Sequence, residues 1–178
     1  NNDGNADFFV YRFGELKRRV ADVMLLNSGD GHFTSSLAHN ATTEVGLKSH
    51  GDSGVAFDYD LDGSIDILSG DDDNGKWHLY KNVTNNTGNN HLLLKIGYSQ
   101  NGVDPYGAKV WITSQGQTQY KLIGSSNANH SQSLLNIAHF GLGEDDMISD
   151  ITVRWRDGTT QTLKNKQANQ LLTLGKSL

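Results

Sequence analysis

The segment Asp58–Asp66 places four aspartates within nine residues, and no other feature constrains the fold as strongly. Asp58, Asp60 and Asp62 alternate along the chain, and Gly63 follows them directly. A loop with acids at positions 1, 3, 5 and 9, glycine at position 6 and a main-chain oxygen at position 7 supplies most of the about six to eight oxygen ligands that Ca²⁺ takes. The spacing therefore predicts a calcium loop. Its predicted ligands are Asp58, Asp60, Asp62, Ser64 and Asp66.

The residues behind the loop indicate which type of calcium site this is. In a helix–loop–helix site position 12 is a bidentate glutamate, whereas here it is Ser69. The apolar pair Ile67-Leu68 instead predicts a β-strand directly after the loop. The alternative is an acidic turn that binds no ion, since Asp and Gly are common turn residues. We favour the cation because close carboxylates repel one another unless a cation or much solvent lies between them.

Composition limits the classes of protein to which the chain can belong. It has 178 residues and no cysteine, so neither a disulfide framework nor a thiolate metal site is available. Twenty glycines and one proline predict many turns between short strands. The sequence contains no run of about 18 apolar residues, so no membrane span is predicted. Residues 1–89 hold fourteen Asp and Glu against seven Lys and Arg, whereas residues 90–178 hold six against eight. The acidic first half argues against a nucleic-acid surface.

The first half contains an internal repeat. The sequence of Asn1–Asp7 aligns with that of Asp60–Asp66 at an offset of 59 residues, and Met24–Asn27 corresponds to Leu79–Asn82. Repeats of short antiparallel strands with this period are typical of propeller blades. Two copies are too few for a closed ring, and the first copy lacks the residues before Asn1. We therefore expect residues 1–89 to be a partial β-propeller-like region of a longer chain.

The second half, residues 90–178, has strand patterns without acidic loops. Ala108–Ile112 and Thr118–Leu122 alternate with a period of two and are joined by Ser114–Gly116, which predicts a hairpin. Another alternating run ends ahead of Asp157-Gly158, a dipeptide that predicts a two-residue type I′ turn. This half is expected to be an antiparallel β-sandwich of six to eight strands without helices. The predicted fold class of the whole chain is all-β.

These features resemble two known families. The repeats are similar to the FG-GAP/VCBS type, in which an Asp-x-Asp-x-Asp-Gly-x-x-Asp loop lies at the edge of each propeller blade. The segment from His91 resembles the ASPIC/UnbV domain. The motifs that carry this second resemblance are Gly107-Ala108-Lys109-Val110, Ser131-Gln132-Ser133, His139-Phe140-Gly141-Leu142-Gly143, Val153-Arg154-Trp155, Asp157-Gly158, Gln161-Thr162-Leu163 and Ala168-Asn169-Gln170. Together the two resemblances cover nearly the whole chain.

The resemblance implies a calcium-bound, extracellular or cell-surface protein engaged in adhesion or glycan contact. It also implies a second cation site in the first copy, which lacks its first acid and carries less charge, so we expect it to bind more weakly. The ligands implied for this second site are Asn1, Asp3, Asn5 and Asp7. A few distant relatives with this architecture resemble sugar-modifying enzymes.

Tryptophans are candidates for carbohydrate binding, because a sugar ring offers an apolar face that suits an indole. Trp77 follows an acidic connection close in sequence to the calcium loop, and Trp111 lies on the strand face opposite Val110 and Ile112. The alternative is that both pack in the core or between domains, as Trp155 is expected to do. No catalytic residue is predicted, because the seven histidines lack metal-site spacing and no Gly-x-Ser-x-Gly motif occurs.

The sequence favours a calcium-stabilised, non-catalytic binding or adhesion module of a larger secreted protein. Its expected partners are a carbohydrate or glycoprotein and the upstream domains of the same chain. Two alternatives stay open. One is the C-terminal portion of a sugar-modifying enzyme of the lyase or dehydratase type with its catalytic residues upstream, and the other is a structural cap of a propeller.

Overall fold

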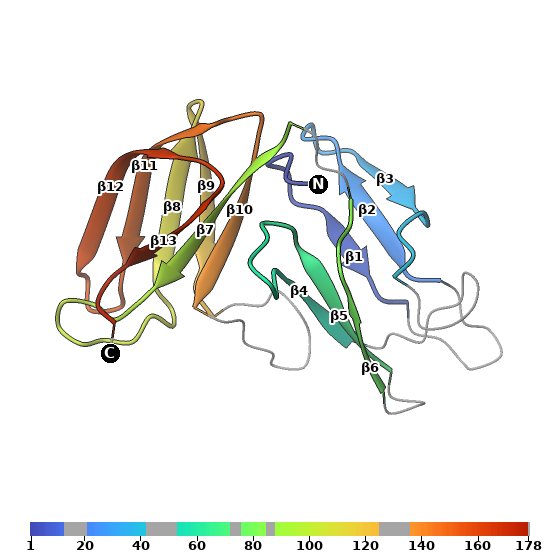
Figure 1. Ribbon diagram of the computed structural model, residues 1–178, viewed down its shortest axis with the longest axis horizontal. Helices are drawn as coiled ribbons and strands as arrows, with labels where there is room; N and C mark the ends of the chain where they lie inside the picture. Colours follow the sequence, from blue (N-terminus) through green and yellow to red (C-terminus); the bar gives the residue numbers. More distant parts are fainter. Residues whose placement is uncertain (13–20, 42–52, 72–75, 85–87, 125–135, 178) are drawn as a thin grey trace.

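All regular structure in the chain is β (Figure 1), as far as the computed structural model describes it, which is for residues 1–12, 21–41, 53–71, 76–84, 88–124 and 136–177. Strands β1 to β6 form two three-stranded sheets, and β7 to β13 form one sheet of three strands and one of four. No helix in these residues is long and apolar enough to cross a membrane. The all-β fold class is confirmed.

The first two sheets repeat the same strand pairing. Their strands are β1 (Phe8–Val10), β2 (Val23–Asn27) and β3 (Phe33–Ser36), and β4 (Ser53–Phe57), β5 (Asp66–Asp71) and β6 (Lys76–Tyr80). Phe8 lies opposite Leu25 in the β1–β2 pair, and at the equivalent position Ile67 lies opposite Tyr80 in the β5–β6 pair. The repeat seen in the sequence is thus also a repeat of backbone pairing.

The two sheets differ in whether the third strand follows or precedes the equivalent strand pair in the sequence. β3 follows β2 and pairs with it, whereas β4 precedes β5 and pairs with that strand. As a result β5 is central in its sheet, while the equivalent β1 is an edge strand. The described part of residues 1–89 forms two separate three-stranded sheets and no closed ring.

Two further sheets share the main hydrophobic core. Their strands are β7 (Asn90–Ile96), β8 (Lys109–Ser114), β9 (Gln117–Leu122), β10 (Ile137–Gly143), β11 (Met147–Arg154), β12 (Thr160–Gln167) and β13 (Gln170–Leu174). Leu92 and Phe140 enter the core from the sheet β10-β7-β13, and Val110 and Ile151 enter it from the sheet β12-β11-β8-β9. All four are fully buried, so the two sheets pack face to face in a sandwich-like arrangement.

The last strand departs from the predicted antiparallel pattern. β13 pairs with β7 in parallel, so the expectation of an entirely antiparallel arrangement is wrong for this pair. The reason is that β12 belongs to the opposite sheet, and the chain crosses over at Ala168-Asn169 before β13 begins. Asn169 adopts a left-handed φ of 56° there, and its N–H donates to the carbonyl of His91.

One of the two predicted turns has a different geometry. Gln115 and Gly116 both have positive φ, 41° and 77°, as a type I′ hairpin requires. In the second turn only Gly158 has positive φ, so the predicted type I′ turn at Asp157-Gly158 is wrong. The carboxylate of Asp157 instead accepts hydrogen bonds from the backbone N–H and the hydroxyl of Thr159, a local contact that stabilises another turn.

The outer face of the sheet β10-β7-β13 receives the loops of both repeats (Figure 1). The carbonyl of Asn2 accepts a hydrogen bond of 2.8 Å from the N–H of Gly143, and the Asn89 amide donates to the carbonyl of Asn1. Leu93 is only 1% exposed although it lies outside the shared core. The repeat loops therefore cover part of the outer face of this sheet, while Lys95 on the same face is exposed.

Replacing Phe140 by alanine tests the importance of the shared core. Because the ring is fully buried, we expect Phe140→Ala to lower the free energy of unfolding of residues 90–178 by about 3–5 kcal/mol, as measured by urea denaturation. The control is Lys95→Ala on the exposed side of β7, which should change it by less than about 0.5 kcal/mol. Equal effects of the two substitutions would contradict the assignment of the core.

Candidate metal centre

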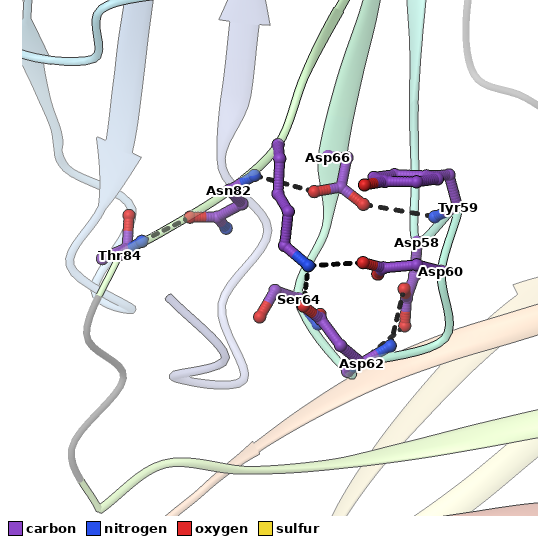
Figure 2. A network of polar contacts seen from close by, with 10 residues as sticks. Asp58, Tyr59, Asp60, Asp62, Ser64, Asp66, Asn82 and Thr84 are labelled. Atoms are coloured by element: carbon purple, nitrogen blue, oxygen red, sulfur yellow. Dashed lines mark hydrogen bonds and ion pairs between the residues drawn. The ribbon is translucent and has the colours of Figure 1, made fainter.

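The loop between β4 and β5 is shaped by its own aspartates. The carboxylate of Asp58 accepts hydrogen bonds from the backbone N–H groups of Asp62 and Gly63, at 3.1 and 2.8 Å. Leu61 and Gly63 have positive φ, 60° and 88°, so the backbone turns twice through the left-handed region. The N–H of Ser64 then donates to the Asp62 carboxylate at 2.8 Å. These contacts fold the segment into a closed loop (Figure 2).

Asp66 ties the loop to the neighbouring strand. Its side chain is fully buried, and its two oxygens accept hydrogen bonds from the N–H groups of Tyr59, at 3.2 Å, and Asn82, at 2.7 Å (Figure 2). Tyr59 belongs to the loop, and Asn82 follows β6. A single carboxylate therefore holds the beginning of the loop beside the end of the next strand.

Three of the five predicted ligands converge on one point. Asp58, Asp60 and Asp66 each offer a carboxylate oxygen, and these oxygens lie within 4.8 Å of one another. Asp58 is 8% exposed, and burial raises the pKa of its carboxyl group. A set of hard carboxylate oxygens without nitrogen or sulfur ligands fits Ca²⁺ by its chemistry. Asp62 lies outside this group of three, and its carboxylate pairs with Lys81 instead.

Lys81 is a participant that the sequence analysis missed. Its ammonium group forms ion pairs with the carboxylates of Asp60 and Asp62, the latter at 3.0 Å. These contacts lower the pKa of Asp62 and raise that of Lys81. In the repeat, the residue equivalent to Lys81 is Leu26, and this difference between the copies was the available signal. The copy with more acids in its loop therefore carries the compensating cation.

The first repeat has the same loop conformation with fewer charges. Asn2 and Gly4 have positive φ, 60° and 86°, and the N–H of Asn5 donates to Asp3 at 2.8 Å, as Ser64 does to Asp62. Asp7 accepts a hydrogen bond from the N–H of Asn27 at 2.9 Å, which matches the contact between Asp66 and Asn82. Asn1 takes the place of Asp60 of the second loop, and its side-chain amide donates a hydrogen bond to the carboxylate of Asp3. The described residues bring no third carboxylate to this loop.

The Gly63 carbonyl connects the acidic loop to the C-terminal sheets. It accepts two hydrogen bonds of 2.9 Å, from the Asn2 amide and from Nε2 of His139 on β10. Because a carbonyl can only accept, His139 is the tautomer with a proton on Nε2. The His91 ring stacks on the His139 ring with 6.2 Å between centroids and lies against Gly63. His139 thus has a structural, hydrogen-bonded role, and its partner on the loop had no sequence signal.

Burial changes the acidity of both histidines. It lowers the pKa of His139 to about 4 and also lowers that of His91, although Asp58 and Asp62 oppose the second shift. Both rings are therefore neutral at pH 7. A neutral His139 donates to Gly63 without adding a positive charge beside the acidic loop.

The two candidate tryptophans lie in different parts of the molecule. Trp77 is 61% exposed on β6 and lies opposite Gly70, four residues along β5 from Asp66, so it is not beside the acidic loop. Trp111 lies on the outer face of the sheet β12-β11-β8-β9, between the buried Val110 and Ile112. The two therefore lie on different sheets. Trp155 is buried, as expected.

Comparison with known proteins supports the C-terminal assignment. Residues 97–177 match the family described as ASPIC and UnbV, so the resemblance is confirmed for this part, which includes Ser131–Ser133 outside the described residues. Human cartilage acidic protein 1 is 26% identical over 129 residues, which are 71% of this chain and 19% of that protein. The chain thus spans about a fifth of this relative. The FG-GAP/VCBS assignment of the first half stays a prediction.

Substitution of Gly63 tests the contact between the loop and the histidines. A Cβ atom on Gly63 would lie 2.1 Å from Cε1 of His91, so we expect Gly63→Ala to displace the ring as well as to strain the backbone. The matched control is Gly102→Ala, since Gly102 has a similar φ of 84° but open space around its Cβ position. Gly63→Ala should lower the free energy of unfolding by about 1–3 kcal/mol more than the control does. Equal losses would show that the close approach is unimportant.

The depressed pKa of His139 predicts loss of stability in acid. The unfolded chain takes up the proton near pH 6.5 and the folded chain only near pH 4, so stability is complete above about pH 6.5 and falls as the pH drops towards 4. We expect a loss of about 2–3 kcal/mol from this residue, measured by urea unfolding across that range. His139→Gln keeps an N–H donor without titrating and should remove this part of the acid sensitivity. An unchanged pH profile in the variant would disprove the role of His139.

Proposed function

We propose that this chain is a calcium-binding, non-catalytic binding module of a larger secreted protein, with a carbohydrate or glycoprotein as its partner. The observation that carries the cation is the convergence of Asp58, Asp60 and Asp66 on one point. Two of these carboxylates are buried, and Lys81 neutralises only part of their charge from a half-exposed position. A divalent ion supplies the missing charge.

The chemistry of the loop favours Ca²⁺ over other cations. Calcium accepts carboxylate and main-chain oxygens in a flexible geometry, whereas Mg²⁺ requires a near-ideal octahedron and retains several waters. Zinc and the later transition metals favour nitrogen and sulfur ligands. In the proposed site Asp58, Asp60 and Asp66 bind the ion first, and Asp62 and the Ser64 carbonyl complete the set once Lys81 moves aside. The first loop, with Asn1, Asp3, Asn5 and Asp7, is the weaker site.

A bound ion stabilises the connection between the two halves. Because the ligands converge only in the folded loop, binding adds about 3 kcal/mol of stability at a hundred times the dissociation constant. The same loop presents the Gly63 carbonyl to Asn2 and His139. Calcium therefore fixes one of the acceptors through which the repeats contact the C-terminal sheets.

The setting in a larger extracellular protein is supported by the comparisons. The chain spans 19% of a relative whose name refers to cartilage, a tissue rich in extracellular matrix. In the intact protein the two repeat sheets would be FG-GAP/VCBS blades of a propeller, with further blades upstream. Extracellular fluid supplies the millimolar calcium that an exposed loop of this kind needs.

A purely structural role is the second candidate function. It is favoured by the hydrogen bonds that Gly143 and His139 of β10 donate to the carbonyls of Asn2 and Gly63, which place the C-terminal sheets against both repeat loops. In that case residues 90–177 would close the end of a propeller without binding a glycan. Binding of a glycan to the full chain separates the two candidates.

Calcium binding is tested by isothermal titration and thermal melting of the full chain. We expect calcium to raise the melting transition of residues 1–89 far more than that of residues 90–178, and chelator to reverse this. Asp60→Ala should weaken the tighter site by at least about tenfold, or about 1.4 kcal/mol, whereas Asp3→Ala should leave it nearly unchanged.

A charge-neutralising variant provides the opposite test. Lys81→Gln removes the cation that competes for Asp60 and Asp62, so it should tighten calcium binding while leaving the loop folded. Melting curves indifferent to calcium and chelator in the wild type would exclude the metal site. Equal effects of Asp60→Ala and Asp3→Ala would contradict the ranking of the two loops.

A further inference from the structure

The outer face of the sheet β12-β11-β8-β9 differs from the outer face of its partner sheet. Val110, Ile112, Ile151 and Val153 point into the core and are at most 1% exposed. The alternate residues of the same strands point away from the core. The opposite sheet has part of its outer face covered by the repeat loops, whereas Tyr120 on this face is 50% exposed. We call this surface the outer face and describe it by six residues, namely Lys109, Trp111, Tyr120, Thr152, Arg154 and Thr162.

An aromatic pair lies across the two neighbouring strands β8 and β9. Trp111 and Tyr120 are direct partners in the strand register, and their ring centroids are 5.5 Å apart with 43° between the ring planes. On the other side of Trp111, the hydroxyls of Thr152 and Thr162 lie 3.2 Å apart. One row across the sheet therefore combines two apolar rings with two hydroxyl groups. This combination suits a sugar ring, which has an apolar face and hydroxyls along its edge.

Two cations lie directly opposite one another in the adjacent row. Lys109 of β8 and Arg154 of β11 are register partners, and like charges in that arrangement destabilise a sheet. Two other cations near this sheet have carboxylate partners, since Lys164 pairs with Asp150 and Arg156 with Asp104. Lys109 and Arg154 form no ion pair within the part of the chain that the structure describes. An anionic ligand would relieve their repulsion.

The cationic row and the aromatic row form one continuous surface. Lys109 and Trp111 are two residues apart on β8, which separates them by about 7 Å along the strand. An acidic group on a sugar stacked over Trp111, or on the next sugar of the chain, can therefore reach Lys109 and Arg154. The surrounding charge agrees, because residues 90–178 hold eight Lys and Arg against six Asp and Glu in a chain of net charge −5.

We propose that the outer face binds an acidic polysaccharide, with sugar rings stacked on Trp111 and Tyr120 and carboxylate or sulfate groups held by Lys109 and Arg154. This inference rests on the proposed function, which it deepens by naming the class of glycan and the surface that binds it. The threonine hydroxyls donate to and accept from the sugar hydroxyls. Calcium acts elsewhere on the molecule, since its ligands lie on the β4–β5 loop.

Binding is measured on the full chain with calcium present, by calorimetry against three oligosaccharides of equal length. Hyaluronan carries carboxylates only, chondroitin sulfate carries carboxylates and sulfates, and a chitin oligosaccharide is neutral. We expect both acidic probes to bind at least about tenfold more tightly than chitin, with an affinity that falls as salt screens the charges. The difference between the two acidic probes shows which acid group the site prefers. Equal affinities for acidic and neutral probes would overturn the proposal.

Substitutions locate the site. Tyr120→Ala and Trp111→Ala should weaken all three probes by about tenfold, whereas Lys109→Glu and Arg154→Glu should weaken only the acidic probes by at least that factor. The matched controls are Trp77→Ala, an exposed tryptophan on β6, and Lys95→Glu, an exposed cation on β7, and both should leave binding unchanged. Melting curves identify any variant that fails to fold. Tyr120 on the edge strand β9 and the charge variants then carry the test, because their side chains lie outside the core.

The possible failures are distinguishable. If calcium binds as proposed but none of the three oligosaccharides does, this inference is wrong and the calcium-binding part of the proposed function stands. If the wild type binds glycan but only Trp77→Ala weakens binding, the proposed function stands and the outer face is not the site. If Tyr120→Ala instead abolishes self-association in sedimentation, a second copy of the chain occupies this face and the inference is overturned.

Discussion

Mutual repulsion among the carboxylates of Asp58, Asp60 and Asp66 is the constraint on which the rest of the structure depends. The same side chains also shape the loop. Asp58 accepts hydrogen bonds from two backbone N–H groups of the loop, and Asp66 accepts one from Tyr59 at the start of the loop and one from Asn82 after β6. Geometry and charge therefore cannot be separated here. Any change that relieves the repulsion by removing an acid also removes a contact that folds the backbone.

The two repeats show how such a loop persists with and without its charge. The first loop keeps the left-handed residues and the Asp7 contact, but Asn1 replaces an acid and donates to Asp3. Where the second copy has Lys81, the first has Leu26. The copy with more acids in its loop has the lysine and the copy with fewer acids has the leucine, which is the pattern expected if the lysine balances the acids. The fold of the loop is thus set by glycine and aspartate hydrogen bonds, and the ion site by the additional acids.

Much of the fold could be predicted from local patterns. Alternation placed Trp111 opposite Val110 and Ile112, and the Ser114–Gly116 signal correctly predicted the hairpin between β8 and β9. The parallel β13 could not be predicted, because a crossover between sheets leaves no periodic signal. The same holds for the site. The acids are visible in sequence, but the pairing of Lys81 with Asp60 and of His139 with Gly63 depends on residues 21 and 76 positions apart.

The hydrogen bond between His139 and Gly63 has a consequence for biosynthesis. A chain leaves the ribosome from its N-terminus, so the acidic loop emerges long before β10, which provides its partner. Until then Asn2 is the one described residue that donates to the Gly63 carbonyl, and the sheet β10-β7-β13 has not yet formed to receive the loops. The nascent repeats are therefore undocked until β10 has been synthesised, and the synthesis of this strand determines when the halves can join.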